Sequence, residues 1–380
     1  YQWLVLSDPD VFSRIVQSLF QMAELSVSIM ILLFGTLTLW LGFLRIAEAA
    51  GLIDTLSRWL SPLFRRLMPE VPKNHPALGL ITLNFAANGL GLDNAATPIG
   101  LKAMRELQSL ILFLVLNTSS LTLLPVTIFM YRAQQGAPDP SLVFLPILLA
   151  TTASSLAGLL AVALVQRIKL TDPVVMLWLG AIAVILGGFM ALLAGLSASA
   201  LSALSSLLGN LILFGLIILF LIFGFIRKVP VYERFIEGAK EGFEIAKSLL
   251  PYLVAMLCAI GALRASGALD ALLELLRWAA AGVGMDTRFI DALPTALTKP
   301  FSGSAARAMM LETMQHHGVD SFAGLLSATV QGSTETTFYV LAVYFGSVGV
   351  QRARHAVPCA LVADFAGIIA AIVVCYWFFT

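Results

Sequence analysis

The sequence predicts an all-α polytopic membrane protein, built as an inverted structural repeat with two re-entrant hairpins and two discontinuous transmembrane helices. Three observations lead to this prediction: uncharged runs long enough to cross a bilayer, apolar stretches too short to cross it, and an internal duplication. Of the 380 residues, 59% are hydrophobic and only 12% are charged. The net charge of +1 provides no basic surface of the kind that binds nucleic acid, so we expect no nucleic-acid partner.

The uncharged runs define the expected spans. Residues 173–226 are 54 consecutive residues without Asp, Glu, Lys or Arg. One crossing needs about 20 apolar residues, so this run predicts two spans. Outside the spans we expect a surface helix near 10–23, amphipathic interfacial helices over 51–68 and 267–281, and a basic connector over 228–247. In chain order, the spans are expected near residues 25–46, 109–131, 142–166, 174–196, 207–227, 248–264, 321–351 and 354–380.

Two further stretches, 74–108 and 287–318, are apolar at both ends, but each apolar leg has only about ten residues. At 1.5 Å per residue such a leg reaches ~15 Å, half of the hydrocarbon core. Polar, glycine-containing tips lie between the legs, and irregular backbone at membrane depth occurs only where it is buried in protein or lines a water-filled cavity. We therefore interpret both stretches as re-entrant hairpins. The alternative is a pair of extramembrane loops with flanking surface helices.

The chain also contains an internal duplication. Gly51-Leu52-Ile53-Asp54 recurs as Gly267-Ala268-Leu269-Asp270 at an offset of 216, and Asn117-Thr118-Ser119-Ser120-Leu121-Thr122 matches Gly332-Ser333-Thr334-Glu335-Thr336-Thr337 at an offset of 215. Counted from the first copy of the leading span, which is included, up to the second copy, there are five expected crossings, and an odd number inverts the second copy. The predicted organisation is a first repeat over 1–170, connecting helices over 171–228 and a second repeat over 229–380. On this topology 16 of the 23 Lys and Arg residues fall on one face, which should be cytoplasmic.

Polar residues interrupt two of the expected spans near their centres. Asn117-Thr118-Ser119-Ser120 interrupts the first, and Gly332-Ser333-Thr334-Glu335-Thr336-Thr337 interrupts the second. Their side chains compete for backbone hydrogen bonds and favour unwinding, and the exposed ends of half-helices hold polar solutes or ions in many transporters. The alternative is that these side chains join helices to one another through hydrogen bonds.

Glu335 and Asp364 are carboxylates deep inside the last two expected spans. An intramembrane carboxylate is a functional hypothesis by default, so both are candidates for coupling to H⁺ or Na⁺. Glu335 is alternatively a structural partner of Lys299 or Arg307, and Asp364 is alternatively a partner of a neighbouring helix. We expect no metal site, because Cys258, Cys359 and Cys375 lie in apolar stretches without paired spacing, and no cofactor.

The candidate substrate-binding residues are the polar side chains of the hairpin tips and the interrupted spans. We expect them to surround one polar cavity near the midplane, since buried polar atoms in lipid must find partners. They are Asn84, Asn88, Asn94, Thr97, Asn117, Thr118, Ser119, Ser120, Lys299, Ser302, Ser304, Ser333, Thr334, Glu335 and Thr336.

Several of these motifs resemble a known family. Asn94-Ala95-Ala96-Thr97-Pro98-Ile99-Gly100-Leu101-Lys102-Ala103-Met104, with Asn117-Thr118-Ser119-Ser120, resembles bacterial spore maturation protein A. Lys299-Pro300-Phe301-Ser302-Gly303-Ser304 and Gly332-Ser333-Thr334-Glu335-Thr336-Thr337 resemble spore maturation protein B. The chain thus resembles a fusion of the two, in the nucleoside-recognition (Gate) group that includes parts of concentrative nucleoside transporters and ferrous-iron permeases. Asp93 departs from the glycine expected at that position, and the leg joining Gln108 to Ser109 is shorter than in the family.

The resemblance implies a transporter-like scaffold in the bacterial cytoplasmic (inner) membrane. We expect a secondary transporter that moves a small polar solute (nucleoside-like, amino-acid-like or a small carboxylate) by alternating access, coupled to H⁺ or Na⁺. The alternative is a non-transporting scaffold or sensor that binds a solute or partner through the same fold. An enzyme is not expected, because no pair of nucleophile and base and no metal-ligand motif occurs. The expected partners are the lipid bilayer, the solute and further copies of the chain in a dimer or trimer.

Overall fold

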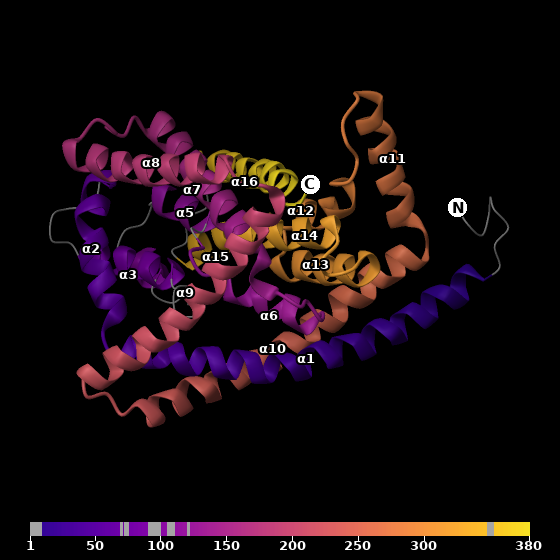
Figure 1. Ribbon diagram of the computed structural model, residues 1–380, viewed down its shortest axis with the longest axis horizontal. Helices are drawn as coiled ribbons and strands as arrows, with labels where there is room; N and C mark the ends of the chain where they lie inside the picture. Colours follow the sequence, from indigo (N-terminus) through magenta and orange to yellow (C-terminus); the bar gives the residue numbers. More distant parts are fainter. Residues whose placement is uncertain are drawn as a thin grey trace.

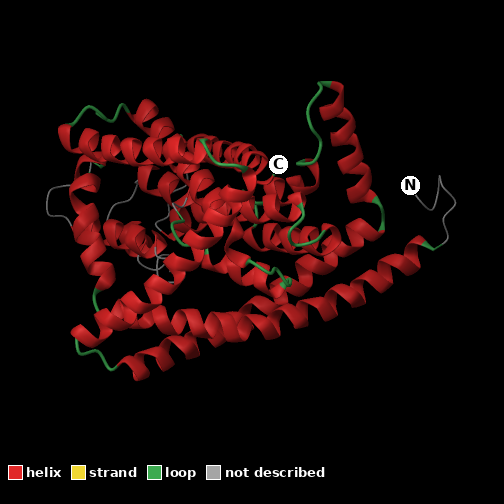
Figure 2. Ribbon diagram, in the orientation of Figure 1, coloured by secondary structure: helices red, strands yellow, loops and turns green. Residues whose placement is uncertain are grey.

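The computed structural model describes residues 10–68, 71, 76–89, 100–104, 111–119, 122–347 and 353–380, and these contain helices and loops but no strand (Figure 2). Residues 100–104 are also helical. The prediction of an all-α fold is therefore confirmed for the described chain. The named helices are α1 (Val11–Ala49), α2 (Leu52–Leu67), α3 (Pro76–Gly89), α5 (Ile111–Ser119), α6 (Val126–Gln134), η1 (Pro140–Val143), α7 (Phe144–Gln166), α8 (Pro173–Ala194), α9 (Ala198–Ile226), α10 (Val231–Ala265), α11 (Ala268–Gly282), η2 (Ile290–Ala292), α12 (Leu293–Thr298), α13 (Gly303–His317), α14 (Phe322–Ser333), α15 (Thr337–Ser347) and α16 (Ala356–Phe379).

Several helices are long and apolar enough to cross a membrane. Within the described residues there are five such helices, α1, α7 with the preceding η1, α8, α9 and α16, or up to six if the bent pair of α10 and α11 is one span. Those last two helices meet at a bend of 68°. On α8, large apolar side chains such as Leu177, Val184 and Ile185 are exposed, as expected for a surface that faces lipid. The chain is a multi-pass membrane protein.

Two expected boundaries are wrong. Residues 10–23 do not form a separate surface helix, because α1 is continuous from Val11 to Ala49. The expected basic connector over 228–247 is also helical, since α10 begins at Val231. The physical reason is that α1 and α10 pack along each other, which gives the polar segments a protein surface to lie against and extends both helices beyond the apolar spans.

The α1 and α10 helices run in opposite directions along the lower edge of Figure 1. The ring of Phe235 lies against Gly42, while Cys258 Sγ lies 3.4 Å from Leu19 O at the other end of the pair. Gly238 packs directly on the α1 backbone, where any Cβ would collide. Adding the repeat offset of 216 to Gly42 gives Cys258, and subtracting it from Phe235 gives Leu19. The duplication therefore relates the contact of Gly42 with Phe235 to the contact of Cys258 with Leu19.

The helices α7 and α16 form a second pair of the same kind. Ser154 Oγ donates a hydrogen bond to Ala363 O over 2.9 Å. Gly158 faces Ala363, and Gly367 faces Ser154, so small residues allow the two helices to approach closely. The two helices also share a short sequence pattern, which is Ala-Gly-Leu-Leu-Ala at 157–161 in α7 and Ala-Gly-Ile-Ile-Ala at 366–370 in α16. Aligning these patterns places Ser154 opposite Ala363 and Gly158 opposite Gly367 in the alignment.

The two interrupted stretches are each divided into two helices. Residues 122–125 separate α5 from α6, with 120–121 outside the described chain, and residues 334–336 separate α14 from α15. We call these two non-helical segments, each together with the last turn of the helix before it, the first break and the second break. The second predicted hairpin is a helix–turn–helix formed by α12 and α13, which pack together. In the first, residues 100–104 return beside α3, where Gly100 faces Asn84.

Candidate functional site

The two breaks are in direct contact, although 217 residues separate the atoms that meet. The backbone N–H of Glu335 donates a hydrogen bond of 2.8 Å to the carbonyl oxygen of Thr118. The last carbonyls of a helix have no partner within that helix, so the end of α5 is open to such a donor. The contact places the polar residues of both halves in one region of the fold.

The first hairpin supports the first break from its own half. Asn88 Nδ2 donates to Asn117 Oδ1 over 3.0 Å and lies 3.4 Å from Asn84 Oδ1. Asn117 Nδ2 in turn donates to Phe113 O over 2.8 Å. Three of the predicted site residues, Asn84, Asn88 and Asn117, therefore form a connected amide network, and Asn84 and Asn117 are buried.

The second hairpin supports the second break in a different way. The backbone N–H of Phe338 donates to Pro300 O over 2.9 Å, and the rings of Phe301 and Phe338 stack with their centroids 5.0 Å apart. Gly303 lies so close to Thr336 Oγ1 that a Cβ at this position would collide with it. A glycine is needed at this position because the hairpin tip and the break touch.

Each hairpin also contacts the broken helix of the opposite half. The hydroxyl of Tyr344, on α15, makes a hydrogen bond with Asn84 and lies against Gly100. The guanidinium of Arg307, on α13, lies 5.4 Å from the ring centroid of Tyr131, at the end of α6. Contacts between hairpins and broken helices therefore join the two halves in both directions.

The remaining predicted residues are placed as follows. Thr118, Ser119 and Ser333 each donate a hydroxyl hydrogen bond to a carbonyl in the preceding helical turn, so these three hydroxyls stabilise helix ends. Ser302 caps α13 by accepting from the N–H of Ala305, and its hydroxyl lies 3.2 Å from that of Ser304. Thr334, Thr336 and Lys299 are buried. Asn94, Thr97 and Ser120 lie outside the described residues.

The two predicted coupling carboxylates differ in their surroundings. Glu335 is half-buried at the second break. Its role as a structural partner of Lys299 or Arg307 stays a prediction. Asp364 is buried on α16 and accepts a hydrogen bond of 2.7 Å from Thr337 Oγ1, so it does have a partner on a neighbouring helix.

Arg132 is a structural residue that the sequence did not single out. Its side chain is fully buried and donates to Pro140 O at 3.1 Å, Val319 O at 3.0 Å, Asp139 O at 3.2 Å and Asp320 Oδ1 at 2.8 Å. It thereby joins the end of α6 to the loop that precedes α14. A lone basic residue at the end of an expected span carries no sequence signal for this role, because arginines at that position usually reach into solvent.

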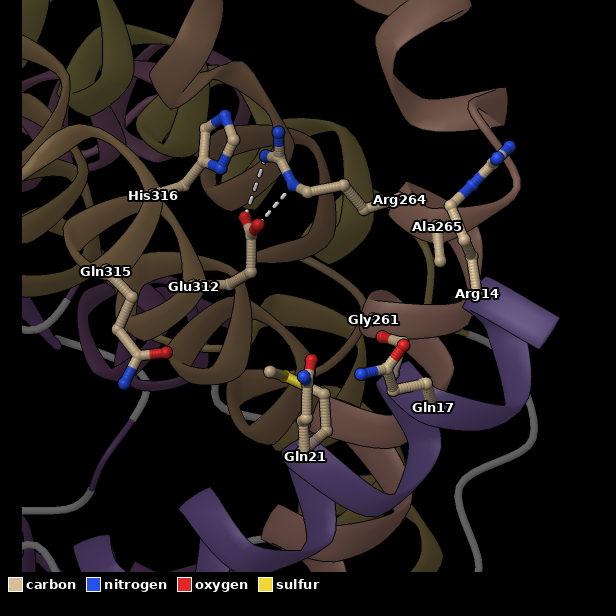
Figure 3. A pocket seen from close by; sticks show the side chains of 11 residues that line it. Arg14, Gln17, Gln21, Gly261, Arg264, Ala265, Glu312, Gln315 and His316 are labelled. Atoms are coloured by element: carbon tan, nitrogen blue, oxygen red, sulfur yellow. Dashed lines mark hydrogen bonds and ion pairs between the residues drawn. The ribbon is translucent and has the colours of Figure 1, made fainter. Parts of the chain in front are cut away.

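A polar cavity of about 460 Å³ lies at the far end of α13, away from the breaks (Figure 3). It opens between the beginning of α1, the end of α10 and the end of α13. Arg264 makes a double contact with Glu312 at its wall, and Arg264 Nη1 also lies 3.2 Å from Asp270 Oδ1. The residues that line the cavity are Arg14, Gln17, Ser18, Gln21, Met22, Gly261, Arg264, Ala265, Glu312, Gln315 and His316.

Comparison with known proteins agrees with this two-part arrangement. The family "Gate: Nucleoside recognition" matches the chain twice, over residues 30–134 and 246–351. The chain is 47% identical over 154 residues to spore maturation protein B of Bacillus subtilis (strain 168), which is 40% of this chain and 85% of that protein. It is 37% identical over 155 residues to spore maturation protein A of the same organism, which is 38% of this chain and 79% of that protein. No solved structure matches. Both breaks and both hairpins lie within the matched segments, and the chain therefore belongs to the nucleoside-recognition (Gate) family and carries that domain twice.

Proposed function

We propose that this protein is a secondary transporter that moves a small polar solute, in the first place a nucleoside-like one, by alternating access. The observation that carries the proposal is the contact between the two breaks, with a hairpin of the same half packed on each. Discontinuous helices that meet at the interface of two repeats form the binding sites of many secondary transporters. The description of the family as nucleoside recognition favours the nucleoside-like class over amino acids or small carboxylates.

The side chains around the breaks suit such a solute. The amides of Asn84, Asn88 and Asn117 each offer donors and an acceptor, which is what the edge of a nucleobase requires. The carboxylate of Glu335 accepts hydrogen bonds from sugar hydroxyls and, being half-buried, is accessible to a ligand. Part of the amide network is satisfied internally, so a solute must exchange hydrogen bonds with Asn88 and Asn117 rather than fill empty positions.

We further propose that the halves are related as an inverted repeat in the bacterial cytoplasmic membrane, with the basic loops on the cytoplasmic side. The antiparallel pairing of α1 with α10 and the reciprocal contacts of α7 with α16 support inversion, because helices related by a two-fold axis in the membrane plane meet in this manner. The excess of Lys and Arg on one predicted face supports the orientation. In such an arrangement, rocking of one half against the other exposes the breaks to each side in turn.

Flux in reconstituted vesicles tests the proposal. Purified protein is incorporated into liposomes, and the uptake of radiolabelled nucleosides, amino acids and small carboxylates is compared with empty vesicles. We expect saturable uptake of a nucleoside-like solute, reduced at least tenfold in Asn117→Ala because a lost buried hydrogen bond is worth about 1.4 kcal/mol or more. Glu241→Gln, an exposed carboxylate on α10, is the matched control and should transport normally. Uptake of no solute above empty vesicles would contradict the proposal.

The charge of Glu335 is tested in the same vesicles. Glu335→Gln keeps the shape and the hydrogen-bonding capacity of the side chain but removes its charge. If Glu335 binds the solute, the variant should insert normally and show a raised KM for uptake. A variant with unchanged KM and unchanged maximal rate would remove Glu335 from the mechanism.

The alternative of a non-transporting scaffold or sensor has one observation in its favour, the close packing of Gly303 on Thr336. A static core would keep that contact dry. Ser304→Cys, in a chain whose Cys258, Cys359 and Cys375 are replaced by serine or alanine, separates the two readings. A transporter should let a membrane-impermeant thiol reagent reach position 304 from one side, and solute should slow the reaction. A position that never reacts while the protein is folded would favour the scaffold.

A further inference from the structure

Asp364 on α16 is a buried carboxylate whose surroundings are incomplete. Only 1% of the residue is exposed. Its Oδ2 atom accepts a hydrogen bond of 2.7 Å from Thr337 Oγ1, but its Oδ1 atom is buried and has no hydrogen-bond partner. A buried ionised group is stable only when it is paired and its remaining lone pairs are satisfied. Asp364 also lies outside both segments that match the nucleoside-recognition family, so the family's own site does not account for it.

The charges around Asp364 do not balance. The helices packed extensively against α16, namely α5, α7, α9, α14 and α15, contain no Asp, Glu, Lys or Arg. Among the described residues, two charged groups interact electrostatically with Asp364, the ammonium of Lys299 and the carboxylate of Glu335. With both carboxylates ionised, these three described groups carry one net negative charge, in a region where an unpaired charge costs several kcal/mol.

A second buried oxygen without a hydrogen-bond partner belongs to Thr334, which packs against α16 one turn from Asp364. Thr334 is 3% exposed, and its Oγ1 atom is buried without a hydrogen-bond partner. Its methyl group packs at Gly367, one helical turn from Asp364, in space that a Cβ would fill. Thr334 also ends α14, where the last helical carbonyls and the negative end of the helix dipole favour a positive charge.

We propose that a single positive charge, carried by Na⁺ or by H⁺, binds between Asp364 and Thr334 at the end of α14. This charge neutralises the cluster of Lys299, Glu335 and Asp364 and occupies the two unpartnered oxygens, Asp364 Oδ1 and Thr334 Oγ1. The role of this site in coupling an ion to flux rests on the proposed transport function. Binding of the charge at the site does not depend on that function. The coupling carboxylate is then Asp364, and Glu335 is left to contact the solute.

The duplication provides a matched control. The alignment of α7 with α16 places Ser155 at the position equivalent to Asp364. Ser155 Oγ is also buried without a hydrogen-bond partner, but it carries no charge. The first half therefore has the same unsatisfied position without the carboxylate, so Ser155→Ala changes an equivalent buried oxygen without changing the charge of the cluster.

The test measures thermal unfolding of the purified full-length protein in detergent. The midpoint is followed against NaCl, with choline chloride at equal ionic strength as the reference, and against pH from 5 to 9. Binding of Na⁺ should raise the midpoint with NaCl and not with choline. Binding of H⁺ should instead raise it at low pH, with loss of that stability as the pH rises. Either dependence should disappear in Asp364→Asn, which is neutral without a bound cation, and should persist in Ser155→Ala. All three proteins contain the same histidines, so the difference between variants is the readout.

The outcomes separate the site from the transport function. A wild-type midpoint that responds to neither Na⁺ nor pH, or a response that survives in Asp364→Asn, overturns the inference. If Asp364→Asn does not fold, Thr334→Val decides: a dependence weakened about tenfold supports the site, because one oxygen ligand is lost, and an unchanged dependence overturns it. Cation-dependent stability without flux of any solute overturns the transport proposal alone. Flux whose dependence on Na⁺ or pH persists in Asp364→Asn overturns the coupling role.

Discussion

Arg132 should be among the most sensitive positions for stability, because its guanidinium serves four acceptors while fully buried. Arg132→Met keeps the length of the side chain but leaves three backbone carbonyls and the carboxylate of Asp320 without their donor. Four bonds from a charged donor at about 1.5–3 kcal/mol each would sum to about 6–12 kcal/mol, an upper limit because neighbouring contributions do not add. The side chain of Asp320 is 43% exposed and can recover hydration, so that bond contributes at the lower end. Loss of one partner of a buried ion pair typically destabilises by about 3–5 kcal/mol, which is the loss we expect.

The assay is the free energy of unfolding from reversible titration of detergent-solubilised protein with a denaturing detergent. Arg132→Lys should lose about half as much, because an ammonium keeps the charge but cannot reproduce the planar fork of donors. Asp320→Asn should lose about 1 kcal/mol, since the amide still offers an acceptor oxygen. Arg58→Met, an exposed arginine on α2, is the matched control and should stay within about 0.5 kcal/mol of wild type. An Arg132→Met variant no less stable than this control would refute the reasoning.

Four further predictions follow from individual contacts in the structure. Gly238→Leu should lose about 1–3 kcal/mol in the same titration, because its side chain would force α1 away from α10. Glu312→Ala should lose about 1–3 kcal/mol by leaving the Arg264 guanidinium with one carboxylate instead of two, while Glu274→Ala, whose side chain is 69% exposed, should lose less than about 0.5 kcal/mol. Hydrogen bonds from the side chain and backbone of Arg288 lower the pKa of Asp286 to about 2, so the stability difference between wild type and Asp286→Asn should be constant from pH 7 to pH 5 and disappear as the pH falls through 2. A chain divided between α9 and α10 and co-expressed as two fragments should co-purify through one tagged half, and fragments that never associate would argue against extensive packing between the halves.

The sequence predicts the parts of this fold that depend on local patterns of apolar and polar residues. Uncharged runs such as 173–226 must be spans, and polar residues near the middle of apolar stretches predicted both breaks. The helical extension of α1 over 10–23 could not be predicted, since its polar residues read as a separate surface helix until the partner α10 is known. The bond from Glu335 to Thr118 was equally hidden, because it joins backbone atoms that any residue supplies. Contacts between halves depend on the fold as a whole, and a single sequence does not reveal them.

The pairing of α1 with α10 has a consequence for assembly. The two matched proteins of Bacillus subtilis are separate chains, and each matches about two fifths of this chain. The helices α1 and α10 correspond to each other in the duplication, so each is also suited to pairing with an identical copy of itself. Such pairing between separate chains would give symmetric dimers that contain only one of the two halves. In this chain α8 and α9 tether the halves and raise their mutual effective concentration to on the order of millimolar. Because both halves belong to one chain, they are always present in a one-to-one ratio. Pairing of the first half with the second half is therefore favoured over pairing between two identical halves.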